Sequence, residues 1–241
     1  MRFKQCEEIE NTKQSNLDTP AAQSILSAAR ECFLEKEYGK VTFRQIAERA
    51  GVTSGLIAYY FESKDRLAAR ITAEYLEEGI QKMDLSAMSG LDSAERFYTV
   101  VFLDWLIIDE NPDFARFYYS YNRSTPGLYW ENGNTYTRLV REFLDEYRLD
   151  VSERQNEIYL IACRGSTREL LLHRHEHPHL ITRETVMDIT TSNYFYNLGM
   201  SDKVIYRVIQ NSKTFFEKAL SPCVSGGVMR GRNKIEYQIG G

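Results

Sequence analysis

The stretch TFRQIAERAGVTSGLIAYYFESKDRL, from Thr42 to Leu67, contains three helix starts and one tight turn within a short span. Thr42 and Gln45 form a capping-box pattern, in which the two side chains satisfy amide groups left unpaired at a helix start. The pattern predicts a helix that opens at Phe43. We expect it to end at Gly51, because glycine readily adopts the left-handed conformation found at helix ends.

A second, short helix is expected directly after this turn. Thr53 or Ser54 supplies its hydroxyl cap, and Phe61 closes it. Ser63 then caps a third helix that begins at Lys64. A helix, a short glycine-containing turn and a short second helix form the helix-turn-helix arrangement, in which the second helix enters the major groove of DNA.

At these residues the chain resembles the TetR family of bacterial transcriptional regulators, and the resemblance covers roughly residues 20 to 75. The matching features are Thr42, Ile46, Ala47, Ala50-Gly51-Val52, Gly55, Ile57, Tyr60-Phe61, Ser63-Lys64 and Leu67. The resemblance implies a homodimer that binds operator DNA. It also implies a C-terminal helical bundle with an apolar pocket, where a bound ligand typically weakens DNA binding.

The short helix should turn Ile57 and Phe61 inward and leave its other side chains outside. A tyrosine ring there can pack on a sugar while its hydroxyl donates to a phosphate. Lys64, at a helix N-terminus, favours a phosphate, and Arg44 can reach guanine with its guanidinium. The predicted DNA-binding residues are Thr42, Arg44, Thr53, Ser54, Gly55, Leu56, Ala58, Tyr59, Tyr60 and Lys64.

Ala58 departs from the family pattern, because TetR-like sequences usually have Tyr at this position. Leu56 and Ala58 can offer only methyl contacts to thymine. Base readout is therefore expected to depend on Arg44, Thr53, Ser54 and the shape of the DNA.

The charge of the whole chain restricts where a nucleic acid can bind. The formal net charge is -4, so no broad basic surface covers the 241 residues. Between residues 40 and 70 the balance reverses, since six basic residues accompany Glu48, Glu62 and Asp65. Contact with DNA is therefore expected to be local.

The cysteines and the N-terminal residues indicate the cellular compartment. The four cysteines are widely scattered and form no CxxC pair, so neither a zinc site nor a disulfide framework is predicted. The acidic N-terminal residues do not resemble a signal peptide, and no stretch reaches the ~18 uncharged apolar residues of a membrane helix. A soluble, cytoplasmic protein is expected.

The helical periodicity along the chain predicts an all-α protein of two domains. The expected ranges are a flexible arm at 1–18, a helix-turn-helix domain with a linking fourth helix at 19–84, a larger helical bundle for ligand binding and dimerisation at 85–220, and a disordered tail at 221–241. We expect the first helix to begin at Pro20 and to end at Gly39. The homodimer is expected to form mainly through about Ser152 to Leu172 and Thr182 to Leu220.

Asp104 stands within the most apolar helical segment of the chain. A carboxylate there is costly unless it is paired or hydrogen-bonded. Arg123, Arg164 or a tyrosine hydroxyl could supply a structural partner, and a cationic or hydroxyl-bearing ligand is the alternative. The aromatic content of this region favours an apolar ligand pocket, for which the candidate residues are Asp104, Trp105, Phe117, Tyr118, Tyr121, Trp130 and Tyr136.

The alternating histidines from His173 to His179 favour a solvated loop over a metal site, because alternation around a proline fixes no ligand geometry. No nucleophile turn or hydrolytic pair is recognisable. The sequence therefore predicts a regulator without cofactor, metal or catalysis. It would repress transcription at a pseudo-palindromic operator until a small apolar or aromatic molecule releases it. The alternatives are a protein-binding adaptor and a metal-dependent helical enzyme.

Overall fold

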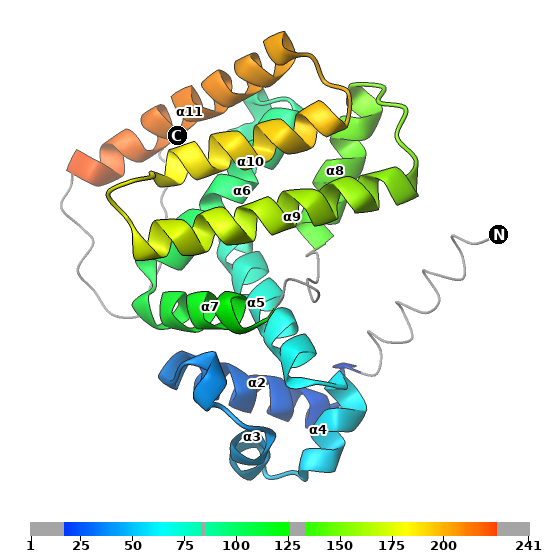
Figure 1. The fold of residues 1–241 in the computed structure, drawn as a ribbon, viewed down its shortest axis with the longest axis vertical. Helices are drawn as coiled ribbons and strands as arrows, with labels where there is room; N and C mark the ends of the chain where they lie inside the picture. The colour runs from blue at the N-terminus through cyan, green and yellow to red at the C-terminus, as the bar shows by residue number, and fades with distance from the viewer. Residues whose placement is uncertain (1–16, 83–84, 126–133, 226–241) are drawn as a thin grey trace. The chain divides into compact units, whose positions relative to one another are not determined.

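The computed structural model describes residues 17–82, 85–125 and 134–225 (Figure 1). Every regular element within these ranges is helical, which confirms the predicted all-α fold. Within the same ranges, no helix has the length and hydropathy that a membrane span requires.

The chain divides into two compact units. The first comprises Met1–Ala73 with Asn111–Glu131, and the second comprises Glu74–Glu110 with Asn132–Gly241. This division differs from the predicted boundary between residues 84 and 85. The division falls within helix α5 (Lys64–Gln81). The sequence could not locate it, because helical periodicity does not show where the packing partners of a continuous helix change.

Helices α2, α3 and α4 and the short turn η1 build the first unit with the start of α5. Their bounds are α2 Pro20–Glu35, η1 Tyr38–Lys40, α3 Phe43–Ala50 and α4 Ser54–Phe61. Thr19 caps α2 by accepting a hydrogen bond from the Ala22 amide. The predicted end of α2 at Gly39 is wrong, since the helix ends at Glu35 and Gly39 lies in η1.

Helix α7 (Pro112–Ser124) also belongs to the first unit, although it follows α6 in the sequence. The Phe117 ring stacks on Phe33 of α2 with 4.8 Å between centroids. The Ser120 hydroxyl accepts a hydrogen bond of 2.9 Å from the Tyr38 amide of η1. Helix α7 therefore supplies part of the core on which α2 and η1 rest.

The second unit contains the end of α5 and most of the remaining helices. Their bounds are η2 Leu85–Gly90, α6 Ser93–Glu110, α8 Asn134–Glu146, α9 Glu153–Glu176, α10 Arg183–Asn197 and α11 Asp202–Ser225. Helix α6 contacts α8, α10 and α11, and α9 packs on α10. Fourteen residues of α6 are buried, between Ser93 and Ile108, which confirms that α6 is covered on most faces.

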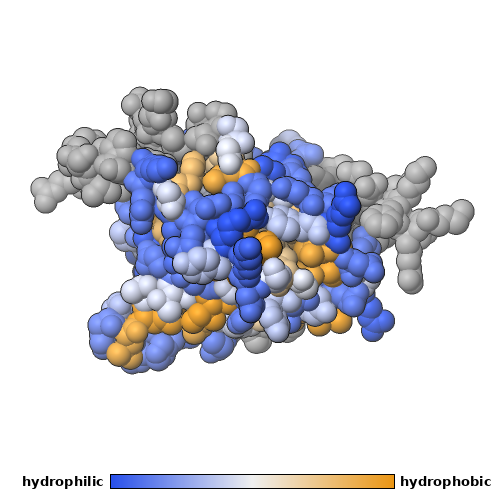
Figure 2. All heavy atoms as spheres, turned by 90° about the horizontal axis from the view of Figure 1, so that it is seen from above, coloured by the Kyte–Doolittle hydropathy of each residue, from blue (hydrophilic) through white to orange (hydrophobic). Residues whose placement is uncertain are grey.

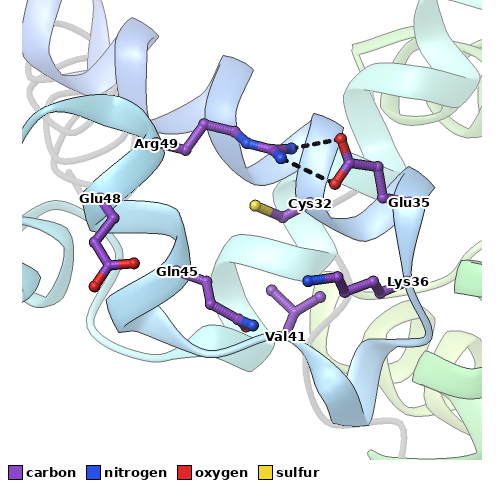
Figure 3. Close-up of a pocket in the computed structure, with 7 residues that line it drawn as sticks. All are labelled: Cys32, Glu35, Lys36, Val41, Gln45, Glu48 and Arg49. Carbon is purple, nitrogen blue, oxygen red and sulfur yellow. Dashed lines mark hydrogen bonds and ion pairs between the residues drawn. The ribbon is translucent and has the colours of Figure 1, made fainter.

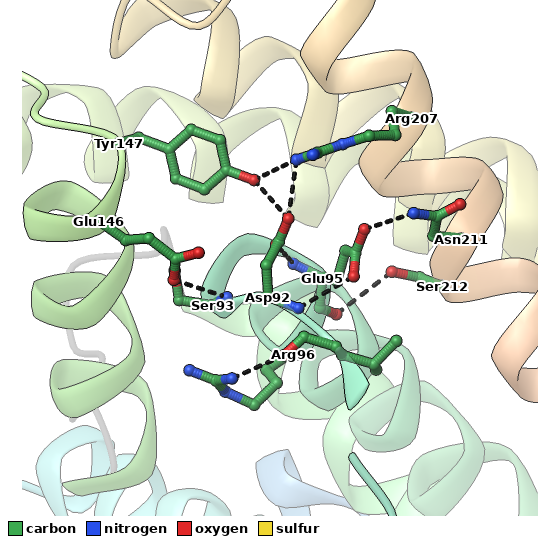
Figure 4. A network of polar contacts seen from close by, with 10 residues as sticks. Asp92, Ser93, Glu95, Arg96, Glu146, Tyr147, Arg207, Asn211 and Ser212 are labelled. Carbon is green, nitrogen blue, oxygen red and sulfur yellow. Dashed lines mark hydrogen bonds and ion pairs between the residues drawn. The ribbon is translucent and has the colours of Figure 1, made fainter. Parts of the chain in front are cut away.

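A polar network joins the start of α6 to α8 and α11 (Figure 4). Asp92 accepts hydrogen bonds from the Glu95 amide at 2.9 Å and from the Tyr147 hydroxyl at 2.6 Å. Arg207 of α11 reaches the same Asp92 carboxylate at 2.7 Å. The buried Glu95 carboxylate accepts a hydrogen bond of 2.6 Å from Asn211, so two helices of the bundle are fixed at the N-terminus of α6.

Two predicted loop or tail segments are helical in part. Helix α9 continues through His173 and His175 to Glu176, and His177 is its C-cap, so the separating loop is shorter than expected. Helix α11 continues to Ser225, within the range predicted to be a disordered tail. Residues 226–241 and residues 1–16 of the predicted arm lie outside the described residues.

Candidate nucleic-acid interface

The first helix of the motif, α3, is fixed at both ends by local interactions. Thr42 accepts a hydrogen bond from the Gln45 amide, and the Gln45 side chain accepts one from the Thr42 amide, which confirms the capping box. Gly51 ends the helix with φ 68° and ψ 31°, in the left-handed region that favours glycine. These interactions set the direction in which the chain enters α4.

Helix α4 has one buried side and one exposed side. Thr53 is its N-cap, and its hydroxyl accepts a hydrogen bond from the Leu56 amide. Ile57 and Phe61 are buried, as predicted. The exposed residues are Ser54, Gly55, Ala58 and Tyr59, while Leu56 is half-buried. Helix α4 thus offers small side chains and one aromatic ring to a groove.

Arg44 projects from α3 into solvent. Its side chain is 86% exposed, and its Nε lies 2.9 Å from Glu48 Oε1 on the same helix. This hydrogen bond raises the pKa of Arg44 above its ordinary value, so the guanidinium stays charged. Exposed pairs of this spacing contribute little to stability, so DNA can compete with Glu48 for Arg44.

The two tyrosines of α4 have different surroundings. Tyr59 is 73% exposed, which leaves its hydroxyl accessible to a phosphate. Tyr60 is half-buried, and its hydroxyl accepts a hydrogen bond of 3.0 Å from Thr19, the cap of α2. Tyr60 therefore holds α4 against α2 in this structure, whereas Tyr59 does not.

Lys64, the first residue of α5, is directed into the first unit. Its ammonium group donates hydrogen bonds to the carbonyl oxygens of Tyr38 at 3.1 Å and Val41 at 2.9 Å. It also lies 4.1 Å from the centroid of the Tyr38 ring, and burial lowers the pKa of Lys64. The side chain predicted to bind phosphate thus fastens the segment between η1 and α3 to the start of α5.

A pocket of 360 Å³ lies between α2 and α3 (Figure 3). Arg49 of α3 crosses to Glu35 of α2 with two hydrogen bonds of 2.8 and 2.9 Å, and this pairing lowers the pKa of Glu35. The same pocket contains Cys32, whose pKa is raised by burial, so its thiol stays protonated and unreactive. The Arg49–Glu35 pair at this pocket joins α3 to α2.

The predicted ligand-binding residues fall into both units. Phe117, Tyr118 and Tyr121 of α7 belong to the first unit, where Tyr121 packs edge-on against Tyr38 with centroids 5.2 Å apart. Asp104, Trp105 and Tyr136 belong to the second unit, and Trp130 lies outside the described residues. The structure thus describes six of the seven predicted residues, three in each unit.

Within the second unit, the Tyr136 hydroxyl of α8 donates a hydrogen bond to Asp104 Oδ2 of α6. Among the described residues, the side-chain hydrogen bond to this carboxylate comes from Tyr136 and not from an arginine. The partner is a tyrosine hydroxyl, which was one of the predicted possibilities. Nothing in the sequence indicated which tyrosine it would be. Across the described residues, no cluster of three or more His, Cys, Asp or Glu residues is arranged to hold a metal ion.

Comparison with known proteins shows which family has a similar helix-turn-helix motif. Residues 25–71 match the model of the bacterial regulatory proteins of the tetR family. The HTH-type transcriptional regulator YfiR of Bacillus subtilis (strain 168) is 35% identical over 63 residues, which are 26% of this chain and 31% of that protein. The HTH-type transcriptional repressor KstR2 of Rhodococcus jostii (strain RHA1) is 31% identical over 85 residues, which are 35% and 42% of the two chains.

The matched stretches therefore make up less than half the length of these curated relatives. Among solved structures, a TetR transcriptional regulator from Rhodococcus sp. RHA1 aligns with a TM-score of 0.46 at 16% identity, over 75% of this chain and 97% of that one. The family model coincides with the stretch from α2 to α5 that carries the capping box, the Gly51 turn and the exposed side of α4. The helix-turn-helix domain at residues 25–71 is therefore that of the bacterial regulatory proteins of the tetR family.

Proposed function

We propose that this chain is a sequence-specific DNA-binding regulator of transcription, without catalytic activity, and that α4 is its recognition helix. The observation that carries the proposal is the two-sided character of α4. Its apolar residues Ile57 and Phe61 are buried, while Ser54, Ala58 and Tyr59 face solvent. Arg44 of α3 is also exposed. A relative with the same type of domain, KstR2, is named a transcriptional repressor, which favours repression as the mode of action.

The exposed residues suggest how the groove is read. Arg44 carries a charged, two-pronged donor group suited to the N7 and O6 atoms of guanine. Tyr59 is placed to contact the sugar-phosphate backbone, and the small residues Gly55 and Ala58 permit a close approach of α4 to the DNA. The hydroxyls of Thr42 and Thr53 accept the N-cap hydrogen bonds of α3 and α4, so these residues contribute to DNA binding mainly by holding the two helices in place.

A single α4 makes few base contacts, so the protein is proposed to act as a homodimer on a pseudo-palindromic operator. Figure 2 shows hydrophobic surface residues gathered in separate patches among hydrophilic ones. One stripe on α9 consists of the exposed residues Ile158, Ile161, Ala162 and Gly165, which share a helix face. We place the dimer interface on this stripe, and we place the site for a small-molecule effector in the second unit.

The decisive experiment measures binding of the full chain to labelled DNA from upstream of its own gene, by fluorescence anisotropy with an unrelated duplex as competitor. Arg44→Ala should weaken specific binding by about 1–3 kcal/mol and relax preference at one base pair. Glu48→Ala is the matched control, because it breaks the same exposed ion pair and keeps the guanidinium. It should bind at least as tightly as the original protein.

Two results would count against the proposal. Equal affinity for the upstream DNA and the unrelated duplex would remove sequence specificity. Equal losses for Arg44→Ala and Glu48→Ala would mean that the ion pair, rather than the guanidinium on DNA, matters. A protein that binds no DNA but retains a specific protein partner would support the adaptor instead.

A further inference from the structure

The Asp104 carboxylate in α6 is incompletely satisfied. The residue is 6% exposed and belongs to the most heavily buried helix of the second unit. One oxygen, Oδ2, accepts the hydrogen bond from the Tyr136 hydroxyl. The other, Oδ1, is buried and has no hydrogen-bond partner in the structure. A buried carboxylate oxygen without a partner costs free energy, so a structural role alone does not explain this residue.

The surroundings of Asp104 are acidic. Glu77 of α5 is close enough to act electrostatically on Asp104, and it accepts a hydrogen bond of 2.6 Å from the buried Thr135 hydroxyl of α8. Among the described residues, no lysine, arginine or histidine forms an ion pair with Asp104. Burial raises the pKa of Asp104, so without a cationic partner the carboxyl is largely protonated near neutral pH, and an approaching cation would favour its ionised form.

The packing indicates from which side a ligand could approach. One turn along α6, Ile107 fits so closely against Gly79 of α5 that an added Cβ at Gly79 would lie 2.4 Å from Ile107 Cδ1. There is no room for a ligand on that side. Tyr136, which contacts Asp104, and Glu77, which acts on it electrostatically, are only half-buried, so a ligand is expected to approach from their side.

We propose that Asp104 Oδ1 recognises a protonated amine, so that the effector of the regulator proposed above is an organic cation with a primary or secondary ammonium group. This inference rests on the proposed function and names the ligand class of its effector site. The ammonium group supplies the missing donor and the missing positive charge together, and a charge-assisted hydrogen bond of this kind is among the stronger ones. The Tyr136 ring, whose hydroxyl contacts Asp104, packs edge-on against Phe97 with centroids 6.3 Å apart, which places aromatic surface beside the carboxyl.

Other occupants fit the site less well. A divalent metal ion needs several oxygen ligands, and the described residues contain no cluster of three or more candidate ligand residues. A neutral hydroxyl donor would satisfy Oδ1 but would not favour the ionised carboxylate, so it would gain no charge-assisted hydrogen bond. An anion would disfavour the ionised form of Asp104 and gain no hydrogen bond from it. A buried water could also donate to Oδ1, and the experiment separates it from the amine, because a water gives no preference among probes.

The test is a calorimetric titration of the full chain with three probes of similar shape: 2-phenylethylamine, 2-phenylethanol and phenylacetate. The original protein should bind the amine about tenfold or more tightly than the alcohol, and phenylacetate most weakly. Asp104→Asn should remove the preference for the amine, because it keeps the shape of the side chain and loses its charge. Asp145→Asn, an exposed change on α8, is the charge-matched control and should keep the preference.

Circular dichroism and operator binding of each variant show that it is folded. Equal binding of the three probes by the original protein, or an unchanged amine preference in Asp104→Asn, would overturn the inference. So would a failure of 2-phenylethylamine to bind. Operator binding separates the two proposals: a chain that binds operator but no amine refutes only the ligand class, whereas a chain that binds the amine and no DNA refutes the regulator.

Discussion

Gly55 lies on the exposed side of α4, and the nearest atom to an added Cβ would be the Thr53 hydroxyl at 3.9 Å. Gly55→Ala therefore fits the folded protein without strain and should raise the free energy of unfolding by about 0.5–1 kcal/mol, because alanine favours the helix. The added methyl group would stand where α4 meets the DNA. We expect higher thermal stability and weaker operator binding, measured on the same preparation.

Ala58→Gly is the reverse exchange on the same exposed side. It should lower stability by a similar amount and leave room at the DNA surface. If Gly55→Ala bound operator as tightly as the original protein, α4 would not approach the DNA at Gly55, and the proposed docking of the recognition helix would need revision.

The Asp104 carboxyl makes stability depend on pH. Burial raises its pKa to about 8, the Tyr136 hydrogen bond opposes this rise, and the charge of Glu77 adds to it. In an unfolded chain an aspartate titrates near ~3.9. Because the folded-state pKa is the higher one, the protonated carboxyl favours folding. This contribution is complete below about pH 4 and is lost as the pH rises towards 8, with a slope of at most about 1.4 kcal/mol per unit.

Asp104→Asn is neutral at every pH and removes this dependence. In urea unfolding between pH 5 and pH 8, its stability relative to the original protein should increase steadily as the pH rises. The comparison between the two proteins cancels the titration of the other acidic groups. Parallel pH profiles for the two proteins would mean that Asp104 is already ionised at low pH, and that its pKa is not raised.

At the scale of single residues, the sequence was sufficient to predict interactions between residues that are close together in the chain. The capping box of Thr42 and Gln45, the turn at Gly51 and the inward direction of Ile57 all depend on residues a few positions apart. Lys64 and Tyr60 could not be placed in this way. Their partners are the carbonyl of Val41 and the hydroxyl of Thr19, and only the tertiary packing of α2 and α3 brings these atoms near.

At the scale of elements, α7 is the helix whose position the sequence did not reveal. Its Ser120 hydroxyl accepts the hydrogen bond from the Tyr38 amide and donates one to the Phe117 carbonyl. Ser120→Ala leaves the Tyr38 amide without this partner and should cost about 1–3 kcal/mol of stability. Since Lys64 binds the Tyr38 carbonyl, η1 should loosen and operator binding should weaken as well.

Ser124→Ala, an exposed change one turn later on α7, is the matched control for Ser120→Ala. Thermal unfolding and hydrogen exchange at the Tyr38 amide provide the measurement. Unchanged exchange at Tyr38 in Ser120→Ala would show that α7 does not support η1, and that its packing on α2 is sufficient without this bond.

The periodicity of the sequence located most helices because each carries its own apolar face and caps. It could not assign α7 to the first unit, because Phe117 and Tyr121 would look the same in either core. The prediction of a loop over the histidine run was wrong in part, because it relied on composition. Helix α9 continues through His173 and His175, and His177 is its C-cap. The His177 ring lies 4.8 Å from the His173 ring, one turn earlier.

At the scale of the whole molecule, the exposed apolar residues lie mainly in the segment where the sequence predicted self-association. On α9, Ile158 is 53% exposed and Ile161 is 59% exposed, which is unusual for isoleucine on a helix that stays in contact with water. Ala162 and Gly165 lie on the same face and are small enough to let a second helix approach closely. This stripe is where we expect two copies of the chain to pair.

Ile161→Glu places a charge at the centre of the stripe and should shift the protein from dimer to monomer in sedimentation at micromolar concentration. Operator affinity should fall with it, since two recognition helices on one pseudo-palindrome bind together only when their chains are joined. Leu180→Glu is the matched control, because Leu180 is 64% exposed but follows α9 outside the stripe. It should remain dimeric and bind operator normally. If Ile161→Glu also remained dimeric, the interface would lie on another face, and the exposed Ile189 and Tyr196 of α10 would be the next positions to charge.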